Sequence, residues 1–187
     1  MQGKKRGRPK AEAPQLSPES IVEAAKGLMK EEGKIPSIRR LAAALGVDAM
    51  AIYHYFKNKE AMLEALAVSL VSEIYEPQIS SRWKQQLSNL AISYIELLQR
   101  YPGLLETLLN MKTLGPATVF MQRFETILKP LGLQQQVQKD ALDLFVDYLH
   151  GFALAMSCNK NCEVALEVNA IEGPLNMYMT MLEDRQV

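Results

Sequence analysis

The sequence predicts an all-α fold divided into a small N-terminal domain and a larger C-terminal one. Apolar side chains recur every three or four residues from residue 18 onward, which is the period of an amphipathic helix. Glycine and proline interrupt the pattern where helices would end, and no segment alternates like a strand. The 187 residues suit one module of about 50 residues and one larger helical domain. We place them at 17–64 and 65–187, after an arm at 1–16.

Charge is unevenly distributed, although 21 basic and 21 acidic side chains cancel over the whole chain. Residues 1–60 carry 12 Lys and Arg against 7 Asp and Glu, whereas residues 61–187 carry 9 against 14. A basic end beside an acidic body is typical of a nucleic-acid binder with a separate second domain. No run approaches 18 apolar residues and no signal-peptide pattern opens the chain, so we expect a cytoplasmic, nucleoid-associated protein without a membrane partner.

The segment 37–60 has the pattern of two short helices joined by a tight turn. An alanine-rich helix ends at Gly46, where a residue that tolerates a positive φ is needed. Asp48 can cap a second helix that runs to about Tyr55, and Ile52 and Tyr55 give this helix its inward face. This arrangement is a helix-turn-helix, which lays its second helix in the major groove of double-stranded DNA.

The residues after the second helix strengthen this interpretation. Phe56 is the inward aromatic, and Asn58 can cap a further helix with Lys59 in its first turn. A cation at that place opposes the helix dipole, so it indicates an outside anion such as a DNA phosphate.

On these residues the chain resembles the Tet-repressor (TetR) family of bacterial regulators. The family signature is represented by Gly46-Val47, Ile52-Tyr53, Phe56, Lys59-Glu60 and Leu63, and the resemblance covers roughly 21–66. It implies a homodimeric repressor that binds a palindromic operator and is released by a small molecule. It also implies that the last two helices of each subunit form the dimer interface.

The same resemblance assigns individual contacts with DNA. Tyr53 and Lys59 match residues that bind phosphate, and Arg39 matches an arginine that reads guanine. The recognition helix starts with Ala49, Met50 and Ala51, which are all apolar. They can contact thymine methyl groups but cannot form bidentate hydrogen bonds to bases, so this helix differs from that of the Tet repressor itself. We expect His54 and Lys57 to contact phosphates or base edges.

The N-terminal arm contains Arg6-Gly7-Arg8-Pro9, which is similar to the core of an AT-hook. Glycine lets the backbone lie deep in a narrow minor groove, and flanking arginines reach its negative potential. We favour minor-groove contact by Arg6 and Arg8 over the alternative of a basic tail that only aids solubility.

The C-terminal domain reads as helices that enclose an apolar interior. We expect helices at 58–77, 81–99, 104–109, 116–128, 134–156 and 170–182. Aromatic residues, leucines and methionines of the central helices are candidates for an effector pocket, although the same residues also make an ordinary core. The candidates are Tyr94, Leu98, Tyr101, Leu105, Met111, Phe120, Met121, Phe124 and Phe152.

Other polar patterns give weaker indications. Asp140, Asp143, Asp147 and His150 recur at helical spacing, and we interpret them as a solvated or interface-rim stripe rather than a metal or catalytic face. Cys158 and Cys162 lack two further zinc ligands, so we expect ordinary reduced thiols, with a thiol or metal sensor as the alternative. No cofactor and no enzymatic activity are expected. A DNA-binding protein without an effector, such as a nucleoid or division factor, remains the other alternative.

Overall fold

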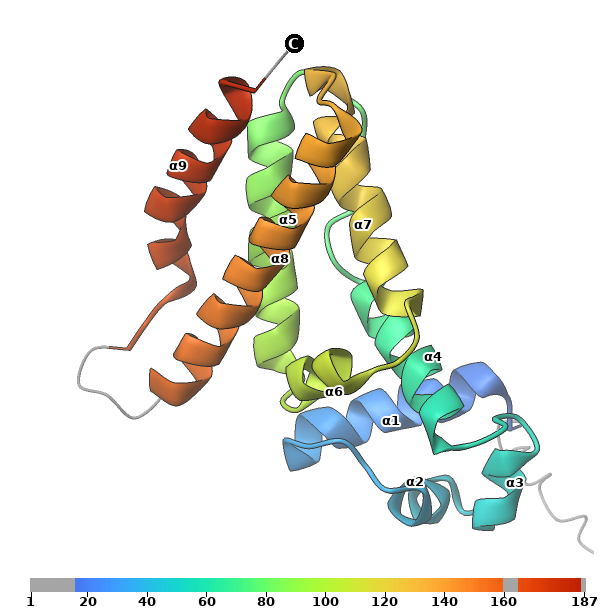
Figure 1. Ribbon diagram of the computed structural model, residues 1–187. Coiled ribbons are helices and arrows are strands. Elements are labelled where there is room, and N and C mark those ends of the chain that lie inside the picture. The colour runs from blue at the N-terminus through green and yellow to red at the C-terminus, as the bar shows by residue number, and fades with distance from the viewer. Residues whose placement is uncertain (1–15, 160–164, 186–187) are drawn as a thin grey trace, which may run out of the picture.

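The computed structural model describes residues 16–159 and 165–185, and every regular element within these ranges is helical (Figure 1). Two lobes are visible in Figure 1: α1 to α3 form the lower one, and α4 rises from it into the larger helical body. The elements are α1 (Pro18–Glu32), α2 (Ile38–Leu45), α3 (Ala49–Tyr53), α4 (Lys59–Val71), α5 (Trp83–Arg100), α6 (Leu104–Asn110), α7 (Gly115–Leu128), η1 (Lys129–Leu131), α8 (Gln135–Cys158), η3 (Val168–Ile171) and α9 (Glu172–Glu183). The predicted all-α class is confirmed.

Local capping signals define the helices of the lower lobe. Ser17 and Ser20 form a capping box, in which each side-chain oxygen accepts a hydrogen bond from the other residue's N–H, at 3.2 and 2.8 Å. Gly33 ends α1 with φ of 65°. Both ends of α1 lie where the sequence predicts them, because a capping side chain and a left-handed glycine each act within one helical turn.

The second helix of the helix-turn-helix is shorter than predicted. It ends at Tyr53, and Tyr55 lies beyond it with 43% of its surface exposed, so the expectation of an inward Tyr55 was wrong. The Tyr55 hydroxyl donates a hydrogen bond to the carbonyl of Leu16 at 2.8 Å, and this bond ties the end of α3 to the entry of α1. Ile52 is the one fully buried side chain of α3 and anchors it inward, together with the half-buried Ala49.

Helix α4 also ends earlier than predicted, at Val71 rather than near residue 77. Its start agrees with the sequence, because the Asn58 side chain accepts a hydrogen bond from the Ala61 N–H at 2.8 Å. Its end is set from a distance: Arg123 of α7 donates hydrogen bonds to the carbonyls of Val71, Ser72 and Ile74. These carbonyls therefore find partners without a further helical turn.

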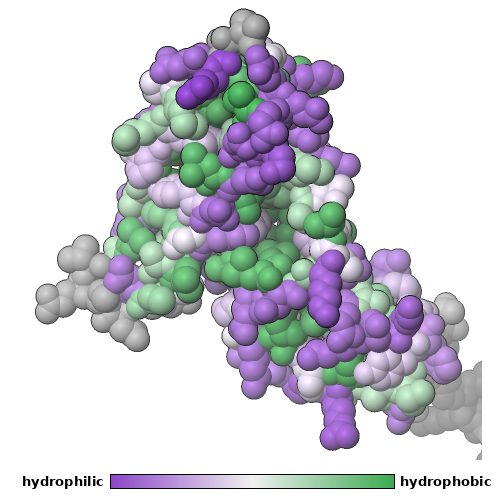
Figure 2. Space-filling model, in the orientation of Figure 1, coloured by the Kyte–Doolittle hydropathy of each residue, from purple (hydrophilic) through white to green (hydrophobic). Residues whose placement is uncertain are grey.

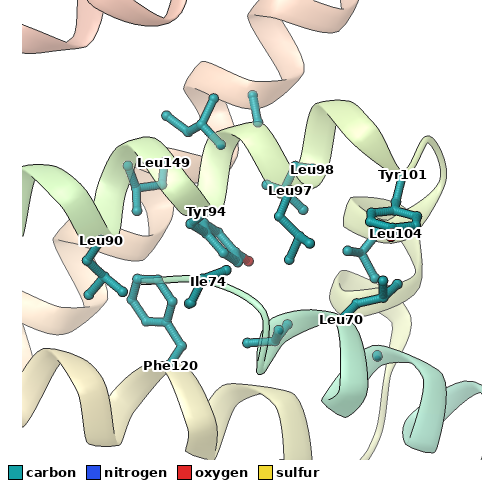
Figure 3. Close-up of a cluster of buried hydrophobic side chains, with 14 of the residues drawn as sticks. Leu70, Ile74, Leu90, Tyr94, Leu97, Leu98, Tyr101, Leu104, Phe120 and Leu149 are labelled. Carbon is teal, nitrogen blue, oxygen red and sulfur yellow. The ribbon is translucent and has the colours of Figure 1, made fainter. Parts of the chain in front are cut away.

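The core of the larger lobe lies where α4, α5, α7 and α8 meet. Figure 3 shows Leu70, near the end of α4, beside Leu104 of α6, and Ile74, in the segment after α4, beside Tyr94 of α5 and Phe120 of α7. All five side chains are buried.

Helix α8 has two apolar faces. Phe145, Leu149 and Ala153 are buried on one face, against α5 and α7, whereas Leu144 and Leu154 are 52% and 57% exposed. By length and composition alone, with a mean hydropathy of 1.2, α8 is apolar enough to cross a membrane. Because one face packs into the domain core, we interpret α8 as a core helix whose second face is left open.

Candidate nucleic-acid interface and internal cavity

The turn between α2 and α3 fixes the orientation of α3. Gly46 adopts φ of 68° and its N–H bonds to carbonyls at the end of α2. The Asp48 carboxylate then accepts a hydrogen bond from the Met50 N–H at 2.7 Å, so α3 begins at Ala49, three residues after the glycine. With Ile52 buried beneath it, α3 presents its start and its outer side to solvent.

The residues predicted to contact DNA lie on the surface of the lower lobe wherever the structure describes them. Met50, with 64% of its surface exposed, is the most prominent side chain at the start of α3. Arg39, Tyr53, His54, Lys57 and Lys59 are also exposed, whereas Ala49 and Ala51 are half-buried. Arg6 and Arg8 lie outside the described residues. The individual contacts stay predictions.

Two neighbouring arginines of α2 differ in their bonding. The Arg40 Nε atom lies 2.6 Å from a carboxylate oxygen of Glu32, so this guanidinium is held against α1. Arg39 forms no ion pair within the described part of the chain and projects from an exposed position. Arg39 is therefore the one whose charge is available to a phosphate or a guanine.

A cavity of about 490 Å³ opens in the larger lobe between α5, α7 and α8. Val71 at the end of α4 and Leu108 of α6 also border it. Of the residues predicted for an effector pocket, Tyr94, Met111, Phe120 and Met121 line this cavity, whereas Leu98, Tyr101, Leu105, Phe124 and Phe152 do not.

The five predicted residues that do not line the cavity have other environments. Leu98 and Tyr101 are buried core side chains, and Tyr101 lies beneath the Lys30 ammonium, 5.2 Å from its ring centre. Phe124 packs on Phe145 and borders a second, more polar hollow beside α8. Leu105 and Phe152 are half-buried, and Phe152 lies against Tyr148. Helical spacing alone does not tell which apolar face meets a void.

One end of the cavity is polar. The Tyr94 hydroxyl and Nε2 of His150 are 2.8 Å apart, within hydrogen-bond distance. Burial raises the pKa of Tyr94 well above its usual value and lowers that of His150, against an opposing effect of the Asp147 charge on the His150 pKa. The pair is therefore neutral near pH 7.

The carboxylates of the acidic stripe of α8 are exposed, as expected of a solvated stripe. Asp143, Asp147 and the half-buried His150 also border the cavity. Asp143 is paired with Lys139 at 2.9 Å. The spacing of three and four residues was the available signal, but it could not show that α7 stands opposite this face. Cavity residues that the sequence reasoning did not select also include Leu142 and Val146 of α8.

The wall of the cavity is connected to α4. Val71 lines the cavity, and its carbonyl accepts a hydrogen bond from the Arg123 guanidinium of α7 at 3.1 Å. The first turn of α7 touches α4 as well: a Cβ atom at Gly115 would lie 2.9 Å from both Glu64 Oε1 and Val68 Cγ2. A change in the position of α7 therefore acts directly on α4.

Other potential chemical sites are sparse in the part of the chain that the structure describes. There, no three His, Cys, Asp or Glu side chains are grouped to hold a metal ion. Cys158 is a free, exposed thiol at the end of α8, and Cys162 lies outside the described ranges.

Two regions of the chain match profiles of known protein families. Residues 21–66 match "Bacterial regulatory proteins, tetR family", and residues 76–171 match "Tetracyclin repressor-like, C-terminal domain". The HTH-type transcriptional repressor DrrR1 of Streptomyces coeruleorubidus is 29% identical over 154 residues, which are 80% of this chain and 57% of that protein. The chain thus spans about half the length of the curated relatives it matches.

Two solved structures share the fold. The Streptomyces coelicolor protein ActR in complex with actinorhodin superposes with a TM-score of 0.78 at 20% identity, over 90% of this chain and 96% of that one. BioQ with its double-stranded DNA operator superposes with a TM-score of 0.72 at 19% identity, over 91% and 99%. Because the sequence identities are only 20% and 19%, these superpositions show that the fold is shared.

Proposed function

Since the chain belongs to the tetR family of bacterial regulatory proteins, we propose that it represses transcription as a homodimer that a small molecule releases from its operator. Membership places it among non-enzymatic regulators, in agreement with the sequence. We further propose a cytoplasmic location, where the DNA partner is found. The observation that carries the proposal is the connection of α3, the exposed helix predicted to contact DNA, through α4 to a solvent-accessible cavity between α5, α7 and α8.

Exposed, unengaged groups support DNA binding by the lower lobe. Arg39, Lys57 and Lys59 supply positive charge around α3. The sequence of the N-terminal arm contains further lysines and arginines. Figure 2 shows a mostly hydrophilic surface at this end of the molecule. In a dimer, two α3 helices enter successive major grooves when they are about 34–36 Å apart.

The open face of α8 supports dimerisation. Leu144 and Leu154 of α8, with Met177 and Met181 of α9, are large apolar side chains exposed on the described surface. Exposed apolar surface of this kind marks a protein–protein contact. We propose that α8 and α9 of two subunits cover one another, and a Leu144→Arg variant, which places a charge in that contact, should then be monomeric in light scattering.

Release follows from a difference in affinity between two conformations. A ligand shifts the balance from 1:99 to 99:1 only if it binds the non-DNA conformation about 10⁴-fold more tightly. A ligand between α5, α7 and α8 would act on α4 through the Arg123 and Gly115 contacts.

The test begins with an operator selected from random DNA by the purified full chain. We expect one palindromic site per dimer, and expect small molecules that raise the melting temperature of the free protein to lower its affinity for that DNA. Ligands that stabilise the protein but never change DNA affinity would instead support the alternative of a DNA-binding protein without an effector.

A further inference from the structure

The formally charged side chains that line the cavity are both carboxylates. They are Asp143 and Asp147 of α8, and among the described residues no lysine or arginine lines the cavity. Asp143 is paired with Lys139, and both side chains of this pair are exposed. Asp147 lies exposed at the edge of the cavity and forms no ion pair with any described residue, so its charge is available to a ligand.

The walls favour a flat, apolar body. The rings of Tyr94 and Phe120 have centres 4.9 Å apart and are tilted by 59°, and Figure 3 shows them next to each other between α5 and α7. Met111 and Met121 add flexible, polarisable surface. Aromatic faces attract cations as well as other rings, so the walls and Asp147 favour the same charge.

The start of α7 is the element of the cavity that would favour an anion, since helix N-termini carry partial positive charge. The ability of this helix start to bind an anion is reduced, because Pro116 has no N–H and the Thr118 N–H donates to the Leu114 carbonyl at 2.7 Å. An anion would also lie beside Asp147 without a lysine or arginine among the described lining residues to compensate.

We propose that the cavity takes an apolar, largely aromatic ligand that carries one positive charge, and that Asp147 receives this charge. The neutral Tyr94–His150 pair carries two polar protons, and its internal hydrogen bond uses one of them. The other proton can be donated to a polar substituent of the ligand, and this substituent need not be an anion. The cavity volume of about 490 Å³ lies within the range of about 300–1,000 Å³ that small ligands occupy. The inference rests on the proposed function in that it names the ligand class of the same regulatory site.

Two acridines of opposite charge test the ligand class on the full chain without DNA. The cation 9-aminoacridine should bind with one site per chain by fluorescence titration, and acridine-9-carboxylate should bind at least tenfold more weakly. Asp147→Asn keeps the shape of the side chain and should weaken the cation about tenfold while leaving the carboxylate no weaker. Asp140→Asn is the matched control, because it removes the same charge from the same helix outside the cavity lining and should change either affinity less than twofold.

The proposal is overturned if acridine-9-carboxylate binds as tightly as the cation, if neither probe binds, or if Asp147→Asn and Asp140→Asn behave alike. Operator release is measured separately, by anisotropy of labelled DNA. Because 9-aminoacridine also intercalates, release is attributed to the cavity only where it is lost in Asp147→Asn. Binding of the cation in the cavity without release of DNA would refute the proposed function and leave the ligand class standing. Release of DNA by acridine-9-carboxylate alone would support the proposed function and refute the ligand class.

Discussion

Replacing Arg123 tests whether α7 holds the end of α4. The guanidinium donates to the carbonyls of Val71 at 3.1 Å, Ile74 at 2.8 Å and Ser72 at 2.8 Å, and its side chain is only 9% exposed. A hydrogen bond to a charged group contributes about 1.5–3 kcal/mol. The bonds to Val71 and Ile74 are the two buried ones, so Arg123→Leu should lower the free energy of unfolding by about 3–5 kcal/mol.

Other contacts of Arg123 change this magnitude little. Glu76, its ion-pair partner, is 77% exposed, and such pairs contribute about 0–1 kcal/mol. Without Arg123, the Val71 carbonyl would keep a weaker hydrogen bond from the Ile74 N–H, at 3.3 Å. The Ile74 carbonyl would lose the only donor that it has among the described residues. A loss of 3–5 kcal/mol corresponds to a fall in melting temperature of roughly 6–20 °C for a chain of this size.

The assay is urea unfolding followed by circular dichroism at one fixed protein concentration. Arg123→Lys should be intermediate, because an ammonium keeps the charge but cannot reach three carbonyls with one planar fork. Arg100→Leu is the control, an exposed arginine at the end of α5, and should change stability by less than about 0.5 kcal/mol. If Arg123→Leu unfolded within 1 kcal/mol of the parent protein, α4 would not depend on this contact.

Three further predictions concern the DNA contacts and the cavity. Tyr53→Phe and Lys59→Ala should weaken binding to all DNA sequences about equally, and Lys59→Ala should reduce the salt slope by about one; a selective loss on the operator would exclude a phosphate role. Arg39→Ala should cost about 1–3 kcal/mol and relax preference at one position per half-site in selection from random DNA, whereas Arg40→Ala should leave that preference unchanged. Burial lowers the His150 pKa, so the unfolded chain binds more protons below its ordinary pKa of 6.5, and stability should fall as the pH drops from 7.5 to 5.5. His150→Gln should flatten that part of the melting-temperature profile; an unchanged profile would mean that His150 is not the group responsible.

The parts of the fold that the sequence predicted depend on neighbouring residues. Ser17, Asn58 and Gly46 each act within one turn, so the starts of α1 and α4 and the end of α2 could be placed from composition and spacing. The end of α4 could not, because it depends on Arg123, some fifty residues later in the chain.

The cavity shows the same limit. Tyr94 and Leu98 are both apolar positions of one helix and differ only in which neighbour they meet. Asp147 is exposed, as its spacing predicts, but only the position of α7 opposite α8 places a cavity beside it. Local periodicity predicts that a face exists, whereas the function of the face depends on the partner helix.

The two lobes are joined at more places than the α4 backbone. Lys26 of α1 is 93% buried and its ammonium lies 2.6 Å from Glu73, just beyond the end of α4. Burial alone would lower the Lys26 pKa, but Glu23 and Glu73 outweigh it, so the pKa is raised and the charge is retained. One turn later, Lys30 lies over the Tyr101 ring at the end of α5.

These two contacts fasten α1 to the end of α4 and to the end of α5 at once. In the proposed repressor, a ligand that moves α7 would displace the carbonyls held by Arg123 and, with them, the neighbouring Glu73. Since Glu73 pairs with Lys26 of α1, the lower lobe would move together with the end of α4. In the proposed dimer, the spacing of two α3 helices would then depend on how far the end of α4 moves relative to Tyr101, where the second contact opposes that movement.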